Sequence, residues 1–596
     1  MVSSVPFDIL ADPQAAIQEL FDKHLQSQSS NEFPSVLSNH LREIFGQEER
    51  LDLIPHLHLD SAQTELPLSA SSGSSSLKSP KLVQFRGMVQ DTSASPELYL
   101  AQLRDAKYGG WGAHDAMNGH VDYSNFREYN RYWVVSVPGE TRWAGQTRSD
   151  SAVASTSRVS HRNADHKFPL PSTVHIGVQV NVYSTQSDPD RDLKSTDIVT
   201  FVGLFEFESN ILHVLFHLNE YSVQKPYRVY PLTVPLEVEM RALQRDLVSW
   251  IANESLAGDM DAAEWVLLSI ISRVQSRHPQ ILPASLTLAR FPPPSPKVIP
   301  AASTSANALH SASASTPALY HILSLLLPII THVPLSLPLL NEGAFVPESK
   351  PRPPSEGVDE DAEDELFSGM LQLPPCTVCL ITDSGVTEGQ INDCGVRNLR
   401  ALQEVIRNQT IEYVFPYSGF RFETDIGCIV CTEGKKSALV ETHITIPLEP
   451  ANSPSSSELQ QKLYKSSAEI NLPSTKKLEV WRKLVGGAIA KQTGRSLNQV
   501  SSSSSSSPPV PVGGIGVSNA AAELIQEEFV QERQNEAKGS KSSVETNNKI
   551  ITTPDDLIHR MLMAKLLALS MHEPEVSLEI WKQMKELEGR RLARMM

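Results

Sequence analysis

Cysteine is the residue type whose spacing in this chain most readily suggests chemistry. All 5 cysteines lie between Cys376 and Cys431, and four of them form two Cys-x-x-Cys pairs, Cys376 with Cys379 and Cys428 with Cys431. Two such pairs are typical of a structural zinc site. The residues around both pairs are apolar, however, and predict β-strands. Because side chains three apart on a strand face opposite sides, we expect buried, unreactive thiols and no bound zinc.

A phosphate-binding loop would be the next indication of catalysis. The sequence contains no Gly-x-x-x-x-Gly-Lys-[Ser/Thr] motif, and Gly513-Gly514-Ile515-Gly516 is a weak substitute because no predicted strand precedes it. No Ser/His/Asp constellation or paired catalytic carboxylates stand out, and His56 and His443 are expected to be structural. We therefore predict no catalytic, cofactor-binding or metal-binding residues, and no enzymatic activity.

The amino-terminal half predicts a helical start followed by a small β-barrel. Asp12-Pro13 is typical of a helix start. Strand patterns, with a bulge expected at Gly87, occur at residues 81–91, 132–137, 174–183 and 198–204. We interpret these strands as a barrel of the OB type with a disordered insertion. OB folds often bind single strands, so a single-stranded nucleic-acid-binding protein is the alternative function.

The carboxyl-terminal half alternates strands with helices, which predicts an α/β layer. A buried helix is expected at 261–273, strands at 286–288, 377–382, 411–415 and 425–432, and a helix from about residue 396. The apolar run 318–340 contains Pro328, Pro334 and Pro338, so we expect a buried helix and a strand there and no membrane span. Helices at 524–533, 553–571 and 577–596 would form a terminal lid.

Length and charge limit the class of protein. The chain has 596 residues, which predicts several domains, and a net charge of -17, which disfavours strong direct binding to nucleic acid. The first residues lack the basic and apolar regions of a secretory signal. We expect an α+β multidomain protein divided as follows: helical region 1–60, linker 61–80, OB-like domain 81–224 with disordered insertion 142–166, α/β domain 225–450 with loops 291–316 and 348–365, helical segment 451–485, disordered linker 486–520, and helical lid 521–596.

Several segments resemble the minichromosome maintenance (MCM) complex-binding protein family. They are residues 83–91 and 96–99, 137–140 with Trp143, 262–264, 368–374, 388–390, 395–396, and 557–570 with Trp581 and 587–588. Each segment is weak alone, but their ordered combination over most of the chain is specific. The sequence departs from the family pattern in its cysteines and at 282–285, where the family has a Gly-Lys turn.

The resemblance implies that the carboxyl-terminal half is a degenerate copy of the MCM ATPase module, which is of the AAA+ class. At the place of the phosphate loop the chain has Ala289-Arg-Phe-Pro-Pro-Pro294, and proline lacks the N–H that a phosphate requires. The acidic pair that would order magnesium and water is Thr382-Asp383, so one carboxylate has become a hydroxyl. Asp555 stands where the lid would present an arginine. A pseudo-ATPase without cofactor is therefore expected.

The resemblance also implies the biological role. We expect a non-catalytic, nuclear regulator of DNA replication that associates with MCM helicase subunits. The family's roles are to promote unloading of the helicase from chromatin and to support sister-chromatid cohesion. Chromatin association would be indirect, and no membrane or strong nucleic-acid contact is expected. The carboxyl-terminal helices are expected to be integral to partner binding.

Overall fold

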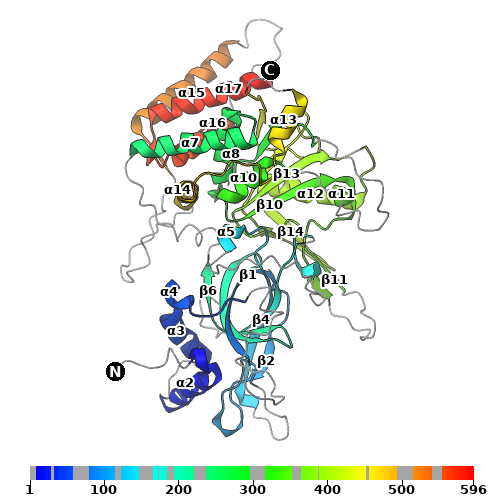
Figure 1. Cartoon of the computed structure of the whole chain (residues 1–596), viewed down its shortest axis with the longest axis vertical. Helices are drawn as coiled ribbons and strands as arrows, with labels where there is room; N and C mark the ends of the chain where they lie inside the picture. Colours follow the sequence, from blue (N-terminus) through cyan, green and yellow to red (C-terminus); the bar gives the residue numbers. More distant parts are fainter. Residues whose placement is uncertain are drawn as a thin grey trace.

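The computed structural model describes residues 9–27, 32–57, 80–113, 123–145, 165–171, 173–183, 193–220, 237–278, 280–294, 316–351, 364–386, 388–451, 455–492, 515–539 and 554–596. These residues form a mixed α+β structure. In Figure 1 the barrel and the amino-terminal helices lie at the lower end, the α/β block lies above them, and the terminal helices form the top. The predicted α+β class is confirmed, while the predicted division into domains stays a prediction.

The amino-terminal helices are α2 (Pro13–Ser27), α3 (Phe33–Phe45) and α4 (Glu48–Leu51). The Asp12 carboxylate accepts a hydrogen bond from the backbone N–H of Ala15 (3.1 Å), as expected of a helix cap. Along α3, Leu37, Leu41 and Phe45 are buried at intervals of one helical turn. This apolar face covers the barrel at β6.

Six strands build the amino-terminal β domain. They are β1 (Lys81–Asp91), β2 (Glu97–Leu100), β3 (Phe126–Val135), β4 (Gly177–Val182), β5 (Ile198–Glu206) and β6 (Ile211–Glu220). The order β1-β5-β6-β4-β3 closes on itself because β3 also pairs with β1, and β2 extends β3. Only β4 and β6 pair in parallel. The result is a closed five-stranded Greek-key barrel of the OB type, as predicted.

Three details of the barrel differ from expectation. The strands β2 and β6 are absent from the sequence prediction. The bulge lies between Val89 and Asp91, not at Gly87. Gly87 is required for another reason, since a Cβ there would lie 2.7 Å from the carbonyl oxygen of Val135 on β3. The insertion predicted at 142–166 begins and ends in ordered helices, α5 (Arg142–Gly145) and η3 (Asp165–Lys167). Residues 146–164 lie outside the described part.

The main sheet of the α/β block is entirely parallel. Its strands are β9 (Leu286–Ala289), β10 (Ile330–Ser336), β13 (Thr377–Gly385), β16 (Ile426–Cys431) and β17 (Ile444–Pro447), in the order β10-β13-β16-β9-β17. The helices of the block are α7 (Glu237–Ser255), α8 (Met260–Ile271), α10 (Ala318–Leu326), α11 (Leu337–Glu342) and α12 (Asp393–Asn408). The predicted helix and strand of the apolar run 318–340 are α10 and β10. No described helix is long and apolar enough to span a membrane.

A second sheet lies beside the first, with the order β12-β11-β14-β15. It contains β11 (Glu348–Pro351), β12 (Asp364–Phe367), β14 (Thr410–Phe415) and β15 (Ser418–Glu423). β11 and β12 are the two ends of the predicted loop 348–365, which pair with each other antiparallel. The loop prediction was therefore wrong at both ends. A short hairpin of β7 (Ser276–Arg277) and β8 (Gln280–Ile281) precedes β9.

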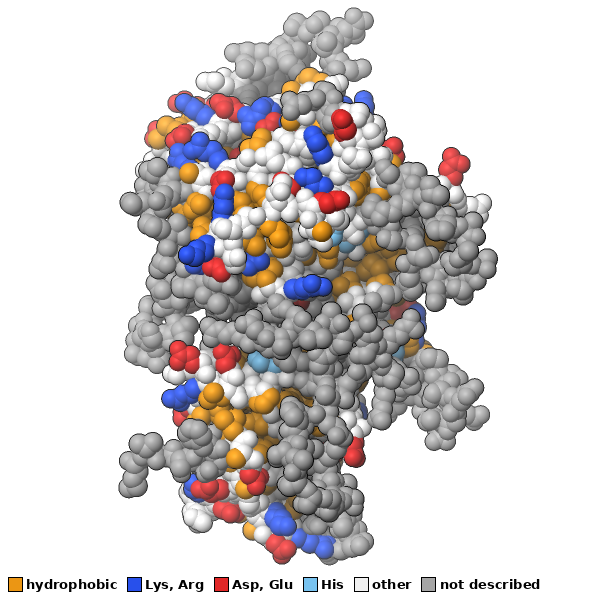
Figure 2. Space-filling view, viewed as in Figure 1, with side chains coloured by type: hydrophobic (Ala, Val, Ile, Leu, Met, Phe, Trp, Pro, Cys, Tyr) orange, Lys and Arg blue, Asp and Glu red, His pale blue; other side chains and the backbone are white. Residues whose placement is uncertain are grey.

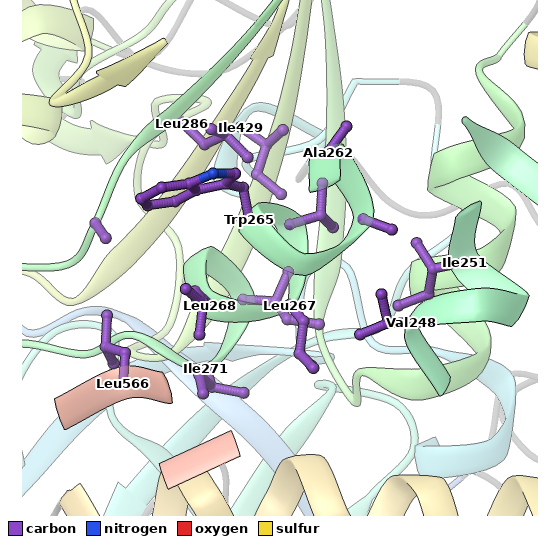
Figure 3. Packing of buried hydrophobic residues seen from close by; sticks show 14 of the residues in the cluster. Val248, Ile251, Ala262, Trp265, Leu267, Leu268, Ile271, Leu286, Ile429 and Leu566 are labelled. Carbon is purple, nitrogen blue, oxygen red and sulfur yellow. The ribbon is translucent and has the colours of Figure 1, made fainter. Parts of the chain in front are cut away.

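The helix α8 lies at the centre of the core. Asp259 caps it by accepting a hydrogen bond from the N–H of Ala262 (3.0 Å). In Figure 3, Trp265 lies near Leu286 and Ile429 of the main sheet, while other side chains of α8 approach α7 and α16 (Pro554–Ser570). A helix buried on most sides must be largely hydrophobic, and nine of the 12 residues of α8 are apolar.

The remaining elements are α13 (Ser456–Leu463), α14 (Thr475–Gln492), β18 (Gly516–Val517), α15 (Asn519–Gly539), β19 (Glu575–Val576) and α17 (Leu578–Met595). The linker predicted at 486–520 was wrong at both ends. α14 continues through the buried Gly486 and Gly487, and Gly516 pairs with Glu575. Residues 493–514, including Gly513 and Gly514, lie outside the described part. The predicted terminal helices are confirmed as α15, α16 and α17.

Candidate functional site

The carboxyl edge of the main sheet is where open α/β folds bind ligands. β9 ends there at Ala289, and Thr382 of β13 lies opposite Cys431 of the intervening β16. The structure thus brings the predicted phosphate-loop position, residues 289–294, and the Thr382-Asp383 pair to one edge. Asp555 lies in the first turn of α16, and its side chain is outside the described part.

The loop after β9 has its backbone N–H groups occupied. The N–H of Arg290 donates to the carbonyl oxygen of Gly434 (3.0 Å), and the N–H of Phe291 donates to that of Thr432 (2.8 Å). The next three residues are prolines, which have no N–H. From Arg290 to Pro294 the loop therefore offers no open backbone N–H to a phosphate, and a phosphate-binding loop must offer several.

Two aromatic rings close this edge. Phe291 is buried, and the Tyr464 ring meets it edge-on with the centroids 5.8 Å apart. The Tyr464 hydroxyl donates to the carbonyl oxygen of Pro292 (3.0 Å). Burial, with a further contribution from Cys431, raises the pKa of Tyr464 and keeps the hydroxyl neutral. The chain's own side chains thus cover the loop after β9.

Thr382 at the end of β13 has a side-chain partner. The His332 Nε2 atom lies 3.2 Å from the Thr382 hydroxyl. Burial, assisted by His321, lowers the pKa of His332 to about 4, so its ring is neutral at pH 7. Among the described residues, no three His, Cys, Asp or Glu side chains are grouped so as to hold a metal ion.

The paired cysteines point into different parts of the core. Cys376 precedes β13 with a left-handed φ of 68° and packs against the larger core cluster, while Cys379 lies in the second cluster. Cys428 and Cys431 are divided between the clusters in the same way. The predicted opposite orientation is confirmed. Burial raises the pKa of Cys379 to about 11, which keeps this thiol neutral.

His443 lies at the other end of the main sheet. Its ring atom Nδ1 is 2.7 Å from the hydroxyl of Ser285, and its backbone N–H donates to the same hydroxyl oxygen (3.0 Å). Ser285 is buried immediately before β9. The pair therefore links the starts of β9 and β17, in agreement with the structural role predicted for His443.

Aromatic rings gather at the end of the barrel that α3 covers. Trp111 and Tyr183 lie with centroids 4.7 Å apart, Tyr99 meets Tyr183 edge-on, and Phe33 of α3 meets Trp111 edge-on. Burial and the neighbouring Glu97 raise the pKa of Tyr129 to about 12. Since Trp111 and Tyr183 are buried, they are not free to stack on bases, as single-strand binding by an OB barrel requires.

A buried polar network joins the barrel to the α/β block. Gln372 of the block donates to the carbonyl oxygen of Gln90 (2.8 Å) and lies 3.1 Å from both the Ser195 and Tyr413 hydroxyls. Those two hydroxyls are 2.7 Å apart. Gln90 and Ser195 belong to the barrel side, so the network fixes the barrel against the second sheet.

The segment around α5 makes a further junction. The Thr141 N–H donates to the carbonyl oxygen of Pro328 (2.8 Å), and the Trp143 indole N–H donates to that of Ser324 (3.0 Å). The Arg482 guanidinium lies 4.1 Å from the centre of the Trp143 ring. The start of the insertion predicted to be disordered therefore ties the barrel to α10 and α14.

Comparison with known proteins extends over both parts of the molecule. The sequence matches the family described as Mini-chromosome maintenance replisome factor over residues 55–167 and 211–595. The chain belongs to this family. Similar proteins named Mini-chromosome maintenance complex-binding protein occur in Arabidopsis thaliana (23% identical, covering 91% of this chain and 93% of the relative) and in Salmo salar (25% identical, covering 98% and 97%). The Homo sapiens protein of that name is 24% identical over 60% of this chain and 45% of its own length.

The family match includes the terminal helix α17, whose arginines have partners that the sequence did not reveal. Arg594 pairs with Asp259 and Asp261 (2.8 Å each), and Arg590 pairs with Asp261 (2.9 Å). Arg591 donates to the carbonyl oxygen of Thr445 (2.9 Å). In the structure they attach α17 to the start of α8 and to β17.

Proposed function

We propose that this protein is a non-catalytic regulator of DNA replication that binds subunits of the MCM helicase. Membership of the Mini-chromosome maintenance replisome factor family supports this proposal. So do full-length relatives whose name is Mini-chromosome maintenance complex-binding protein. We infer the absence of catalysis from the loop after β9, because its backbone N–H groups either donate within the chain or are missing at the prolines.

We further infer that the α/β block with its terminal helices is an inactive ATPase-like module. When the strands of its main sheet are numbered along the chain, they lie side by side in the order fifth, first, fourth, third and second. P-loop ATPases of the AAA+ class arrange their core strands in this order, which supports the inference by analogy of fold. Tyr464 over Phe291, and Thr382 in place of a carboxylate, are consistent with a module that keeps the shape without the chemistry.

The finer roles that we propose are unloading of the helicase from chromatin and support of sister-chromatid cohesion, in the nucleus. Chromatin association would be indirect, through the helicase subunits. Depletion of the protein should leave MCM subunits on chromatin late in replication, as measured by chromatin fractionation, and re-expression should reverse this. Timely release in depleted cells would contradict the unloading role.

Binding and catalysis can be tested on the purified protein. Immobilised full-length protein should bind a purified MCM complex in a concentration-dependent, saturable manner. It should release no phosphate from ATP above a heat-inactivated control, and Asp383→Asn should change neither result. ATP-dependent phosphate release that Asp383→Asn abolishes would refute the inactive module.

The alternative, a single-strand-binding protein, is less well supported. The barrel's central rings lie under α3, and on the face shown in Figure 2 the described Lys and Arg side chains are interspersed with Asp and Glu. Fluorescence titration with labelled oligonucleotides decides between the two functions. We expect no sub-micromolar binding with a steep salt dependence.

A further inference from the structure

The β14–β15 hairpin carries an exposed aromatic surface that the function proposed above does not use. Every residue of β15 is exposed, including Phe420 (55%) and Phe422 (42%), and Tyr417 at the turn is fully exposed. In the pairing register Phe420 lies opposite Tyr413, and Phe422 lies opposite Ile411. Since paired residues share a face, this exposed surface continues directly from the buried Tyr413 and Ile411.

β15 is also an open sheet edge. It pairs with β14 over its whole length without a bulge, and no other strand in the described part of the chain pairs with it. Its outer backbone N–H and C=O groups therefore form a row that can accept another strand.

The other edges of the two block sheets are protected. The edge strand β17 contains Pro447, and Arg591 of α17 donates to its Thr445 carbonyl oxygen. The edge strand β10 contains Pro334. The edge strand β12 is short and begins with Asp364 and Glu365. Proline, charge and a covering helix are the devices by which proteins block unwanted strand pairing. β15 carries the charges of Arg421 and Glu423, but it has neither a proline nor a covering helix among the described residues.

The charges on the opposite face of β15 are of mixed sign. Arg421 lies 3.9 Å from Glu404, and Glu423 lies 3.1 Å from Arg277. A surface for a nucleic-acid backbone would be uniformly basic. A cation and an anion two residues apart instead suit a polypeptide strand that places an acidic residue beside Arg421 and a basic residue beside Glu423.

We propose that β15 is a docking edge to which an extended segment of a protein partner adds as a further strand. Apolar side chains at alternate positions of that segment would cover Phe420 and Phe422. This inference rests on the proposed function, because it takes an MCM subunit as the partner. It specifies the second sheet, rather than the terminal helices alone, as a surface of contact.

The test uses the full-length protein and a purified MCM complex. Phe420→Lys combined with Phe422→Lys should weaken binding at least about tenfold, because charge at an edge disfavours strand addition and two aromatic contacts are lost. Phe420→Thr combined with Phe422→Thr, which keeps a high strand propensity, should also weaken binding. The matched control is Leu98→Lys on β2 of the barrel, also exposed (62%), which should bind as the unmodified protein does. Circular dichroism checks that each variant is folded.

Hydrogen exchange supplies an independent readout. Amides of residues 418–423 should gain protection when the MCM complex is bound. If the unmodified protein binds but both double variants bind equally well and these amides stay unprotected, the docking edge is refuted while the proposed function stands. If the unmodified protein does not bind, the proposed function fails first. Loss of a concentration-dependent dimer in the variants, seen by sedimentation with no effect on MCM binding, would assign the edge to a second copy of the chain and overturn the proposal.

Discussion

At the scale of single residues, Arg594 connects the end of the chain to the core. Its side chain is only 12% exposed and pairs with Asp259, which is 1% exposed, as well as with Asp261. Asp259 also caps α8 and accepts a hydrogen bond from the N–H of Glu449 (2.8 Å). Removing one partner of such a pair leaves a buried charge without its counter-ion, which is strongly destabilising.

We therefore predict that Arg594→Met lowers the free energy of unfolding by about 3 kcal/mol. Arg590→Met is the matched control, since Arg590 contacts the same Asp261 but is 49% exposed. It should cost less than about 1 kcal/mol. Urea denaturation followed by tryptophan fluorescence measures both. Equal losses for the two variants would show that burial of the Arg594 pair has no special importance.

His332 gives a residue-scale prediction about pH. Its pKa is lowered by burial from 6.5 to about 4, so the unfolded chain binds a proton more tightly than the folded one. The stability that His332 contributes is thus present above pH 6.5 and is lost as the pH falls from 6.5 toward 4. Between about pH 7 and about pH 5 the loss should be roughly 2 kcal/mol. His332→Gln should reduce the acid sensitivity by that amount. Urea denaturation of both proteins at a series of pH values measures the free energy of unfolding of each. The same loss of stability with falling pH in the two proteins would contradict the prediction.

At the scale of elements, the sequence predicts the helices and strands whose apolar residues form a strong pattern. The sequence predicts the buried helix α8 and the strands β13 and β16 because their apolar residues follow a clear pattern. β15 was missed because its side chains are all exposed, so no burial pattern marks it. The predicted linker begins at Gly486-Gly487, although both residues lie inside α14 and are buried.

The candidate site could be predicted only in part. The end of β9, the prolines after it and the Thr382-Asp383 pair were identified from the sequence. The covering of that edge by Tyr464 could not be, because Tyr464 comes from more than a hundred residues further along the chain. Burial of the barrel's rings by Phe33 depends in the same way on a contact distant in sequence.

The terminal helices belong to the main core, which changes what their removal would do. Trp581 of α17 is buried, and its indole N–H donates to Glu528 of α15 (3.0 Å). Leu566 of α16 lies in the same core cluster as α8. We predict that Trp581→Ala lowers the free energy of unfolding by about 3–5 kcal/mol, measured by urea denaturation.

A fragment ending at residue 507 should keep the barrel folded but lose MCM binding. Undiminished co-precipitation of MCM subunits by a folded fragment would place the binding surface elsewhere.

At the scale of the whole molecule, polar contacts fix the barrel to the α/β block. The Gln372 network and the contacts of Thr141 and Trp143 lie at separate points of the junction. Arg86 and Glu140 form a further ion pair beside it, and Glu140 forms a β-bridge with Ile329. Buried polar groups hold only one arrangement well, so we infer that the barrel and the block move as one body. A partner bound to either part would then be held in a defined position relative to the other.

The junction can be weakened at Gln372. Gln372→Ala leaves the buried carbonyl oxygen of Gln90 without this donor and removes the amide beside Ser195 and Tyr413. The Ser195 hydroxyl still donates to that oxygen (3.2 Å), so the change removes hydrogen bonds worth about 0.5–1.5 kcal/mol each, all of them at the contact between the two parts. In scanning calorimetry we expect one main transition for the unmodified protein and two for Gln372→Ala, one for the barrel and one for the block. Gln403→Ala is the control, because Gln403 is partly exposed and bonds to Glu441 within the block. It should keep a single transition, and a single transition in Gln372→Ala as well would show that the barrel and block are coupled by other contacts.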